Sequence, residues 1–81
     1  MLEDLKASQV LVGTRQTMKA VRADQAERVY LALDADAPIK KEVEMLCENH
    51  GVEITFVNSM SELGTACGIE RKTAAAVLLK E

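Results

Sequence analysis

The stretch Arg28-Val29-Tyr30-Leu31-Ala32-Leu33 decides the fold of this chain. It is apolar at almost every position, whereas a strand with one solvated face alternates apolar and polar residues. The run therefore predicts a strand that is covered on both faces. Such a strand needs a helix layer on either side, so we expect an α/β protein whose sheet lies between two layers of helices.

Helices and strands are predicted to alternate on both sides of this run. The glycines, one proline and the capping-box sequence Ser59-Met60-Ser61-Glu62 mark where elements begin and end. The apolar spacing between these signals predicts four helices and four strands. The helices are expected over 2–8, 14–22, 38–50 and 59–67, and the strands over 10–12, 28–33, 52–57 and 73–79.

Length and composition restrict the class of protein. The chain of 81 residues suffices for one domain, which buries roughly 60 to 65% of its unfolded surface. Aromatic residues make up only 2%, so the core must be aliphatic. The start Met1-Leu2-Glu3-Asp4 is acidic where a secretory leader is basic, and no apolar run approaches the roughly 20 residues of a membrane helix. We therefore expect a cytoplasmic protein with no membrane partner.

The cysteines and the histidine offer no catalytic or metal-binding set. Cys47 and Cys67 stand apart without a CxxC pattern, and we expect them to be reduced and to pack as small apolar side chains. His50, the only histidine, stands at a predicted helix end, where a capping or solvated role is expected. The chain therefore predicts no catalytic residue, no metal, no cofactor and no enzymatic activity.

Two kinds of phosphate chemistry are disfavoured. A P-loop needs a second glycine and a hydroxyl residue after its lysine, and the stretch from Gly13 to Lys19 has neither. Asp34 and Asp36 follow a buried strand, as phosphoacceptor carboxylates do, but the chain offers no obvious lysine or threonine set to complete that chemistry. Asp36 also stands two residues before Pro38, where a helix cap belongs.

The stretch Gly13-Thr14-Arg15-Gln16-Thr17-Met18-Lys19 leads from a strand into a basic helix. Helical numbering places Arg15, Lys19 and Arg22 on one face, and no acid on that helix neutralises them. Phosphates would supply the missing counter-charge, although a plain solvated face has the same pattern. A net charge of −3 argues against indiscriminate nucleic-acid binding, and two aromatic residues cannot form a stacking platform for single strands. A structured RNA, rather than DNA, is the nucleic acid that remains.

Four separated blocks strengthen this hypothesis, namely Val12–Ala20, Ala32–Asp36, Leu63–Glu70 and Ala74–Val77. Together they resemble the kink-turn-binding L-seven-Ae ribosomal protein superfamily, most closely its small bacterial members of the YbxF type. The resemblance implies a three-layer α/β/α sandwich with a four-stranded mixed sheet. It also implies that residues 1–81 form a single kink-turn RNA-binding domain. A kink-turn is an internal loop in which tandem sheared G·A pairs follow a three-nucleotide bulge.

The resemblance implies that the start of the basic helix reads the RNA. Arg15 and Gln16 match the two positions that read the G·A edges, where archaeal and eukaryotic relatives carry Asn-Glu and bacterial relatives carry Lys-Gln. Arg can donate two bonds to a guanine edge, and Gln can both donate and accept. Lys19 matches a phosphate-contacting lysine, while Gly13 and Thr14 are expected to place these contacts.

The second half of the chain completes the implied site. Asp36 matches an acidic residue near the extruded nucleotide. The loop Ile69-Glu70-Arg71-Lys72 matches the loop that packs on the bulge, with Arg71 as its phosphate or base contact. Three further cations have no match in the family, so we interpret them first as surface charges and second as auxiliary phosphate contacts: Arg22, Lys40 and Lys41.

The predicted function is to bind and stabilise kink-turns in ribosomal RNA or in riboswitch-type messenger elements. The protein is expected to act as a monomer, with the ribosome among its candidate partners. The alternative is a protein-interaction module that does not bind RNA directly, which the net acidity and four solvated carboxylates suggest. These carboxylates are Glu42, Glu44, Glu48 and Glu53. Co-purification with and without ribonuclease separates the two hypotheses.

Overall fold

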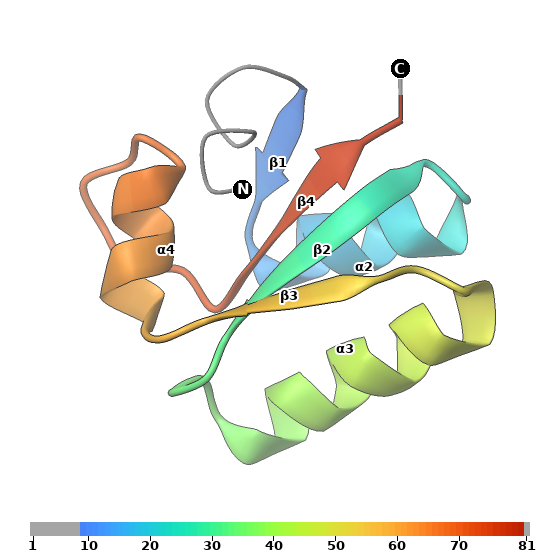
Figure 1. Cartoon of the computed structure of the whole chain (residues 1–81), viewed down its shortest axis with the longest axis horizontal. Helices are drawn as coiled ribbons and strands as arrows, with labels where there is room; N and C mark the ends of the chain where they lie inside the picture. The colour runs from blue at the N-terminus through green and yellow to red at the C-terminus, as the bar shows by residue number, and fades with distance from the viewer. Residues whose placement is uncertain (1–8, 81) are drawn as a thin grey trace.

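The structure, a computed structural model, describes residues 9–80. Helices and strands alternate along this part of the chain (Figure 1). Their bounds are β1 Val10–Val12, α2 Thr14–Arg22, β2 Ala26–Ala32, α3 Ala37–His50, β3 Ile54–Val57, α4 Met60–Ala66 and β4 Ala75–Leu79. The helix predicted over 2–8 lies outside the described residues. The other seven elements are confirmed, with different bounds for three of the strands.

The predicted bounds of these three strands were wrong because hydrogen-bonded pairing with a neighbouring strand, and not the local apolar run, determines where a strand begins. β2 begins two residues earlier than predicted because Ala26 pairs with Leu79 of β4. β3 begins two residues later, at Ile54, which pairs with Val29 of β2. β4 also begins two residues later, at Ala75.

The sheet is mixed, as predicted, and its strand order is β1-β4-β2-β3. β2 and β3 are parallel, with α3 as the connection between them, and β4 runs antiparallel to both β1 and β2. Consequently β1, β2 and β3 all point in one direction, and β4 begins where these three strands end. This arrangement brings four connections of the chain to the same edge of the sheet.

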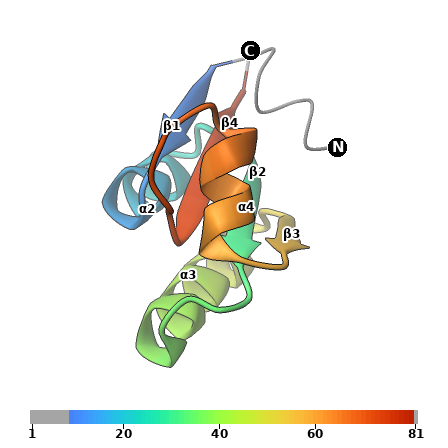
Figure 2. The ribbon, with the colours of Figure 1, turned by 90° about the vertical axis from the view of Figure 1, so that its left-hand side faces the viewer.

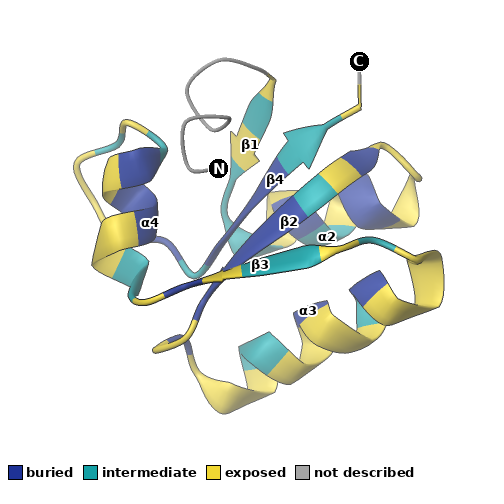
Figure 3. Ribbon diagram, viewed as in Figure 1, coloured by how far each residue is buried: buried dark blue, intermediate teal, exposed yellow. Residues whose placement is uncertain are grey.

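The central strand β2 is covered on both faces, as its apolar run predicted. Val29 and Leu31 face α2 and α3, whereas Tyr30 and Ala32 face α4, because successive side chains of a strand point to opposite faces. Figures 1 and 2 show the resulting three layers, with α2 and α3 on one face of the sheet and α4 on the other. The α/β/α sandwich is therefore confirmed, and Figure 3 shows the buried residues concentrated on β2 and β4.

The predicted turn signals end and begin the helices. Pro38 stands in the first turn of α3, and Gly51 closes that helix with a left-handed φ of 68°. Ser59 caps α4, since its side chain accepts a hydrogen bond from the Glu62 N–H at 3.0 Å. The second bond of a capping box, from the Ser59 N–H to the Glu62 carboxylate, does not form within residues 9–80. The capping prediction is thus confirmed for the serine only.

Candidate nucleic-acid interface

The candidate residues gather at one edge of the sheet, which we call the carboxyl edge. It consists of Gly13 with the first turn of α2 (residues 13–16), the connection after β2 (33–36), the end of the connection after β3 with the first residue of α4 (58–60), and the connection before β4 (69–74). Three backbone hydrogen bonds tie these connections together: Gly13 N to Ala75 O at 2.9 Å, Ala32 N to Ala74 O at 2.9 Å and Leu33 N to Val57 O at 2.8 Å. Figure 2 looks onto this edge.

The start of α2 is open to an anionic ligand. Gly13 has a φ of 112°, a conformation that side chains rarely allow. The first helical bond runs from Thr17 N to Gly13 O at 2.9 Å, so the N–H groups of the three preceding residues point out of the helix without helical acceptors. No side chain among residues 9–80 caps this end, and its first turn contains no acid. Its partial positive charge is therefore available to a phosphate or a base edge.

The outer face of α2 carries the predicted cationic row. Arg15, Gln16 and Lys19 are exposed, and so is Arg22 one turn further on. None of these three cations forms an ion pair with any residue between 9 and 80. Val21 is buried on the opposite side of the helix, as predicted. The cations of this row therefore face solvent without an acidic partner in the described part of the chain.

The 69–72 loop supplies a second group of free cations. Glu70, Arg71 and Lys72 are exposed, and Ile69 is half-buried. Neither Arg71 nor Lys72 has an acidic partner in the described part of the chain. The loop packs on α4 through its backbone, since Ile69 N donates to Gly64 O at 3.1 Å. A Cβ on Gly64 would overlap the Arg71 carbonyl oxygen, so the absence of a side chain there permits this packing.

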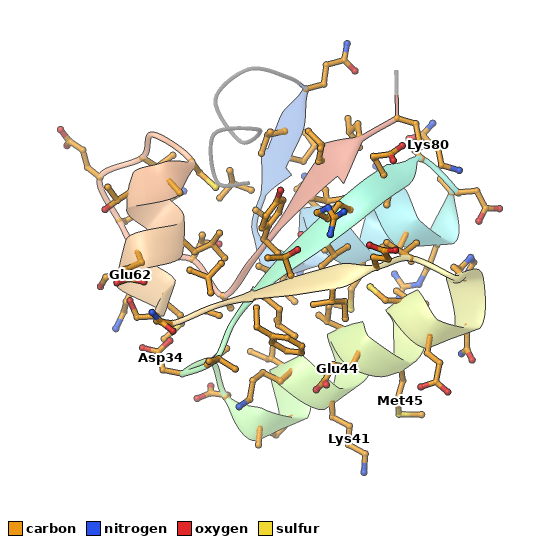
Figure 4. The ribbon with its side chains drawn as sticks, in the orientation of Figure 1. Asp34, Lys41, Glu44, Met45, Glu62 and Lys80 are labelled. Atoms are coloured by element: carbon orange, nitrogen blue, oxygen red, sulfur yellow. The ribbon has the colours of Figure 1, made fainter. Side chains whose placement is uncertain are left out.

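The two aspartates after β2 have roles that the sequence did not predict. Asp36 stands at the N-cap position of α3 as expected, but its side chain makes no capping bond and remains exposed. Asp34 instead accepts the N–H of Met60, the first residue of α4, at 2.8 Å. Figure 4 shows Asp34 near the start of α4, beside Glu62. Asp36 therefore occupies the N-cap position of α3 as predicted but does not make the capping hydrogen bond that the prediction implied. Asp34 instead accepts a hydrogen bond from the first residue of a different helix, α4.

Two further polar side chains were assigned only surface or capping roles. Lys40 donates from Nζ to the Leu33 carbonyl oxygen at 2.8 Å, which holds this cation at the carboxyl edge. Its contact follows from the turn between β2 and α3, which helical numbering does not reveal. His50 Nδ1 lies 3.1 Å from Asp24 Oδ1 and links the end of α3 to the turn after α2. This pair lies at the opposite edge of the sheet from the candidate site.

The described residues offer no obvious alternative site for metal or thiol chemistry. Residues 9–80 contain no group of three or more His, Cys, Asp or Glu side chains placed to hold a metal ion. Burial raises the pKa of the Cys47 thiol from 9.0 to about 11, and burial also raises the pKa of the Cys67 thiol. Both thiols are therefore protonated and weakly nucleophilic at neutral pH. No helix in the described part of the chain is long and apolar enough to cross a membrane.

The structure brings the candidate segments together at the carboxyl edge. Gly13 is bonded directly to the strand that the 69–72 loop enters, with Thr14, Arg15 and Gln16 immediately after it. Asp36 follows β2 at the same edge, and Lys19 lies one turn along α2. A shallow hollow of about 260 Å³ lies at the opposite edge, lined by Gln9, Asp24, Gln25, Leu79 and Lys80, and includes none of the candidate residues.

The protein is thus an α/β/α sandwich whose carboxyl edge carries Arg15, Arg71 and Lys72 without acidic partners among residues 9–80. Comparison with known proteins identifies its family. The model of the Ribosomal protein L7Ae/L30e/S12e/Gadd45 family matches residues 2–81. The chain belongs to this family.

Similar proteins include small bacterial chains of nearly the same length. An RNA-binding protein of Bacillus pumilus is 39% identical over 74 residues, which cover 91% of this chain and 90% of the relative. RNA-binding protein YbxF of Geobacillus stearothermophilus is 38% identical over 76 residues, which cover 94% and 93%. The YbxF-type resemblance that the sequence indicated is thereby confirmed.

Solved structures confirm the fold. The 15.5kD RNA binding protein of Giardia lamblia superimposes with a TM-score of 0.85 at 31% identity, over 99% of this chain and 71% of the other. A protein of unknown function from Bacillus halodurans superimposes with a TM-score of 0.86 at 28% identity, over 98% of this chain and 83% of the other.

Proposed function

We propose that this protein binds structured RNA through its carboxyl edge and that its target is the kink-turn. One observation carries the proposal: an uncapped helix start and a cationic loop meet at one edge, and neither has an acidic partner among residues 9–80. Unneutralised cations and free amides are the groups that bind phosphates and base edges. The family and the names of the relatives support RNA as the ligand.

The proposed interface divides into two contacts. At the first, Arg15 and Gln16 read the edges of the sheared G·A pairs while Lys19 binds a phosphate. At the second, the 69–72 loop packs on the bulge, and Asp36 lies near the extruded nucleotide. Gly13 and Thr14 allow the RNA backbone to approach the helix amides. Because the two contacts engage different parts of one bent RNA, binding favours the sharply bent state.

The shortage of exposed aromatic rings favours a folded RNA over an extended single strand. The sequence contains two aromatic residues, and Tyr30 is only 1% exposed. Phe56 is 47% exposed on the edge strand β3. A single ring does not form the row of platforms on which successive bases of a single strand stack. Recognition by shape, phosphates and a few base edges needs no such row.

The cellular setting belongs to the same proposal. We infer that residues 1–81 act as one kink-turn-binding domain, as a monomer in the cytoplasm and without enzymatic activity. The targets are kink-turns in ribosomal RNA or in riboswitch-type messenger elements. Crosslinking in cells followed by sequencing of the bound RNA identifies which of these is used.

The proposal is tested with two RNAs that differ only in the bulge. Calorimetry and gel shift should detect binding to a kink-turn RNA that is much tighter than binding to the same duplex without the three-nucleotide bulge. Lys41→Ala is a control for the loss of one positive charge outside the proposed site, since Lys41 points away from the sheet on the outer face of α3 (Figure 4). It should leave the discrimination unchanged. Equal affinity for the two RNAs would refute the proposed function.

A further inference from the structure

A single carbonyl oxygen connects the start of α2 with the end of the connection that contains the 69–72 loop. The Ala75 oxygen accepts the Gly13 N–H at 2.9 Å and also accepts the Thr73 hydroxyl at 2.9 Å. Gly13 begins the turn into α2, and Thr73 ends the connection that contains the 69–72 loop. A carbonyl oxygen has two lone pairs, and both are used here. The end of the loop and the start of the helix are therefore held to one atom.

Thr73 is attached on two sides and is nearly inaccessible. It is 8% exposed, and its backbone N–H donates to the Met60 carbonyl oxygen at 3.2 Å. Its main chain thus holds the loop end to α4, while its side chain holds the loop end to β4. Because the hydroxyl is buried and already bonded, it can influence a ligand only through the position of the loop.

The loop before Thr73 carries two cations, Arg71 and Lys72, on exposed residues. Ile69 N is bonded to Gly64 O, and the Arg71 carbonyl lies against Gly64. The side chains of Arg71 and Lys72 are exposed and have no ion pair within residues 9–80. The direction in which these two side chains point into solvent therefore depends on the backbone of the loop between its two hydrogen-bonded ends. A loop that is ordered before binding loses less conformational entropy when it binds.

We propose that Thr73 is a positioning residue for RNA binding, whose hydroxyl holds the 69–72 loop in place relative to the start of α2. This inference rests on the proposed function, and it assigns Thr73 an effect on affinity without any contact to the RNA. When the hydroxyl is removed, the end of the loop loses its bond to Ala75 O. The order of the loop must then be restored at the moment of binding, which weakens the complex.

Two matched pairs of proteins isolate the hydroxyl from the rest of the side chain. Wild type is compared with Thr73→Val, which keeps the branched shape, and Thr73→Ser is compared with Thr73→Ala. Affinity for a kink-turn RNA is measured by calorimetry at a temperature where circular dichroism shows each protein folded. Within each pair, loss of the hydroxyl should weaken binding roughly threefold to tenfold, the range that one intramolecular hydrogen bond supports. If Thr73→Val does not fold, the Ser and Ala pair decides the question.

A double-mutant cycle separates positioning from general stability. In the background Arg71→Ala with Lys72→Ala, the loop has no cations to position, so removal of the Thr73 hydroxyl should change affinity by a factor near one. A factor that persists undiminished in this background overturns the inference. Equal affinity within both matched pairs overturns it as well, while leaving the proposed function intact. If wild type does not distinguish the kink-turn RNA from the unbulged duplex, the proposed function fails and the inference fails with it.

Discussion

Gly64→Ala tests the packing of the 69–72 loop against α4. A Cβ built on Gly64 would overlap the Arg71 carbonyl oxygen and would lie 3.0 Å from the Arg71 carbonyl carbon and 3.2 Å from the Lys72 Cα. All three neighbours are backbone atoms, so no side-chain rotation relieves the overlap. The substitution must therefore move the loop away from α4 or move α4 on the sheet.

The expected cost combines three contributions. Overpacking a close contact typically costs about 1 to 3 kcal/mol. The backbone bonds from Ile69 N to Gly64 O and from Thr73 N to Met60 O hold the same loop, and the loss of one adds about 0.5 to 1.5 kcal/mol. Alanine regains roughly 0.8 to 1.0 kcal/mol over glycine in a helix. The net expectation is a free energy of unfolding lower by about 1 to 3 kcal/mol.

Thermal and urea denaturation measure this change. For a domain of this size each kcal/mol lowers Tm by roughly 4 to 8 °C, so a loss of about 1 to 3 kcal/mol should lower Tm by about 4 to 24 °C. Thr65→Ala is the matched control, because Thr65 is the next residue of α4 and is exposed. It should change stability by no more than about 0.5 kcal/mol. A Gly64→Ala protein as stable as wild type would show that the loop backbone does not pack on this glycine.

Three other predictions concern the core, the RNA contacts and a buried thiol. Thr17 Oγ1 is buried and has no hydrogen-bond partner among residues 9–80, so Thr17→Val should raise the free energy of unfolding by about 1 kcal/mol and with it the urea midpoint. A lower midpoint would show that this hydroxyl has a partner in solution. Arg15→Ala should weaken kink-turn binding by about 1 to 3 kcal/mol, whereas Lys19→Ala should flatten the salt dependence by about one unit of slope. Unchanged affinity and unchanged slope would remove these residues from the interface. Burial raises the pKa of Cys47 from 9.0 to about 11, so the folded protein holds this proton more tightly than the unfolded chain does. The contribution of this thiol to stability should therefore be fully present below pH 9 and should be lost as the pH rises from 9 to 11. The stability of Cys47→Ala should fall less between pH 9 and 11 than that of wild type. Identical pH profiles for the two proteins would show that ionisation of Cys47 does not cause this loss.

The elements of the fold could be predicted from the sequence because their signals are local. The apolar run around Tyr30 indicated a strand covered on both faces, and Pro38 and Gly51 marked the ends of α3. Which strands pair is not a local property, so the mixed sheet was predicted only through the family resemblance. The same limit explains the strand bounds, since the pairing of Ala26 with Leu79 joins distant parts of the chain.

The candidate site was predicted as a set of segments but not as an arrangement of contacts. The basic face of α2 follows from helical numbering, and the 69–72 loop follows from the resemblance. The bonds from Lys40 Nζ to Leu33 O and from Met60 N to Asp34 Oδ1 bridge connections that meet only after the sheet has formed. Thr73 carried no signal at all, because a threonine ahead of an apolar strand is unremarkable until its hydroxyl is seen on Ala75 O.

The hydrogen bond from Leu79 N to Gln9 O, 2.9 Å long, brings the first and last parts of the described chain together. This bond joins the start of β1 to the end of β4, at the far side of the sheet from the connections that carry the cations. A short tether between Gln9 and Lys80, with new ends opened in the turn near Gly51, should give a circular permutant in which the proposed RNA-binding surface is unaltered. A fluorophore or an affinity matrix attached at Lys80 should likewise lie away from RNA bound at the proposed site.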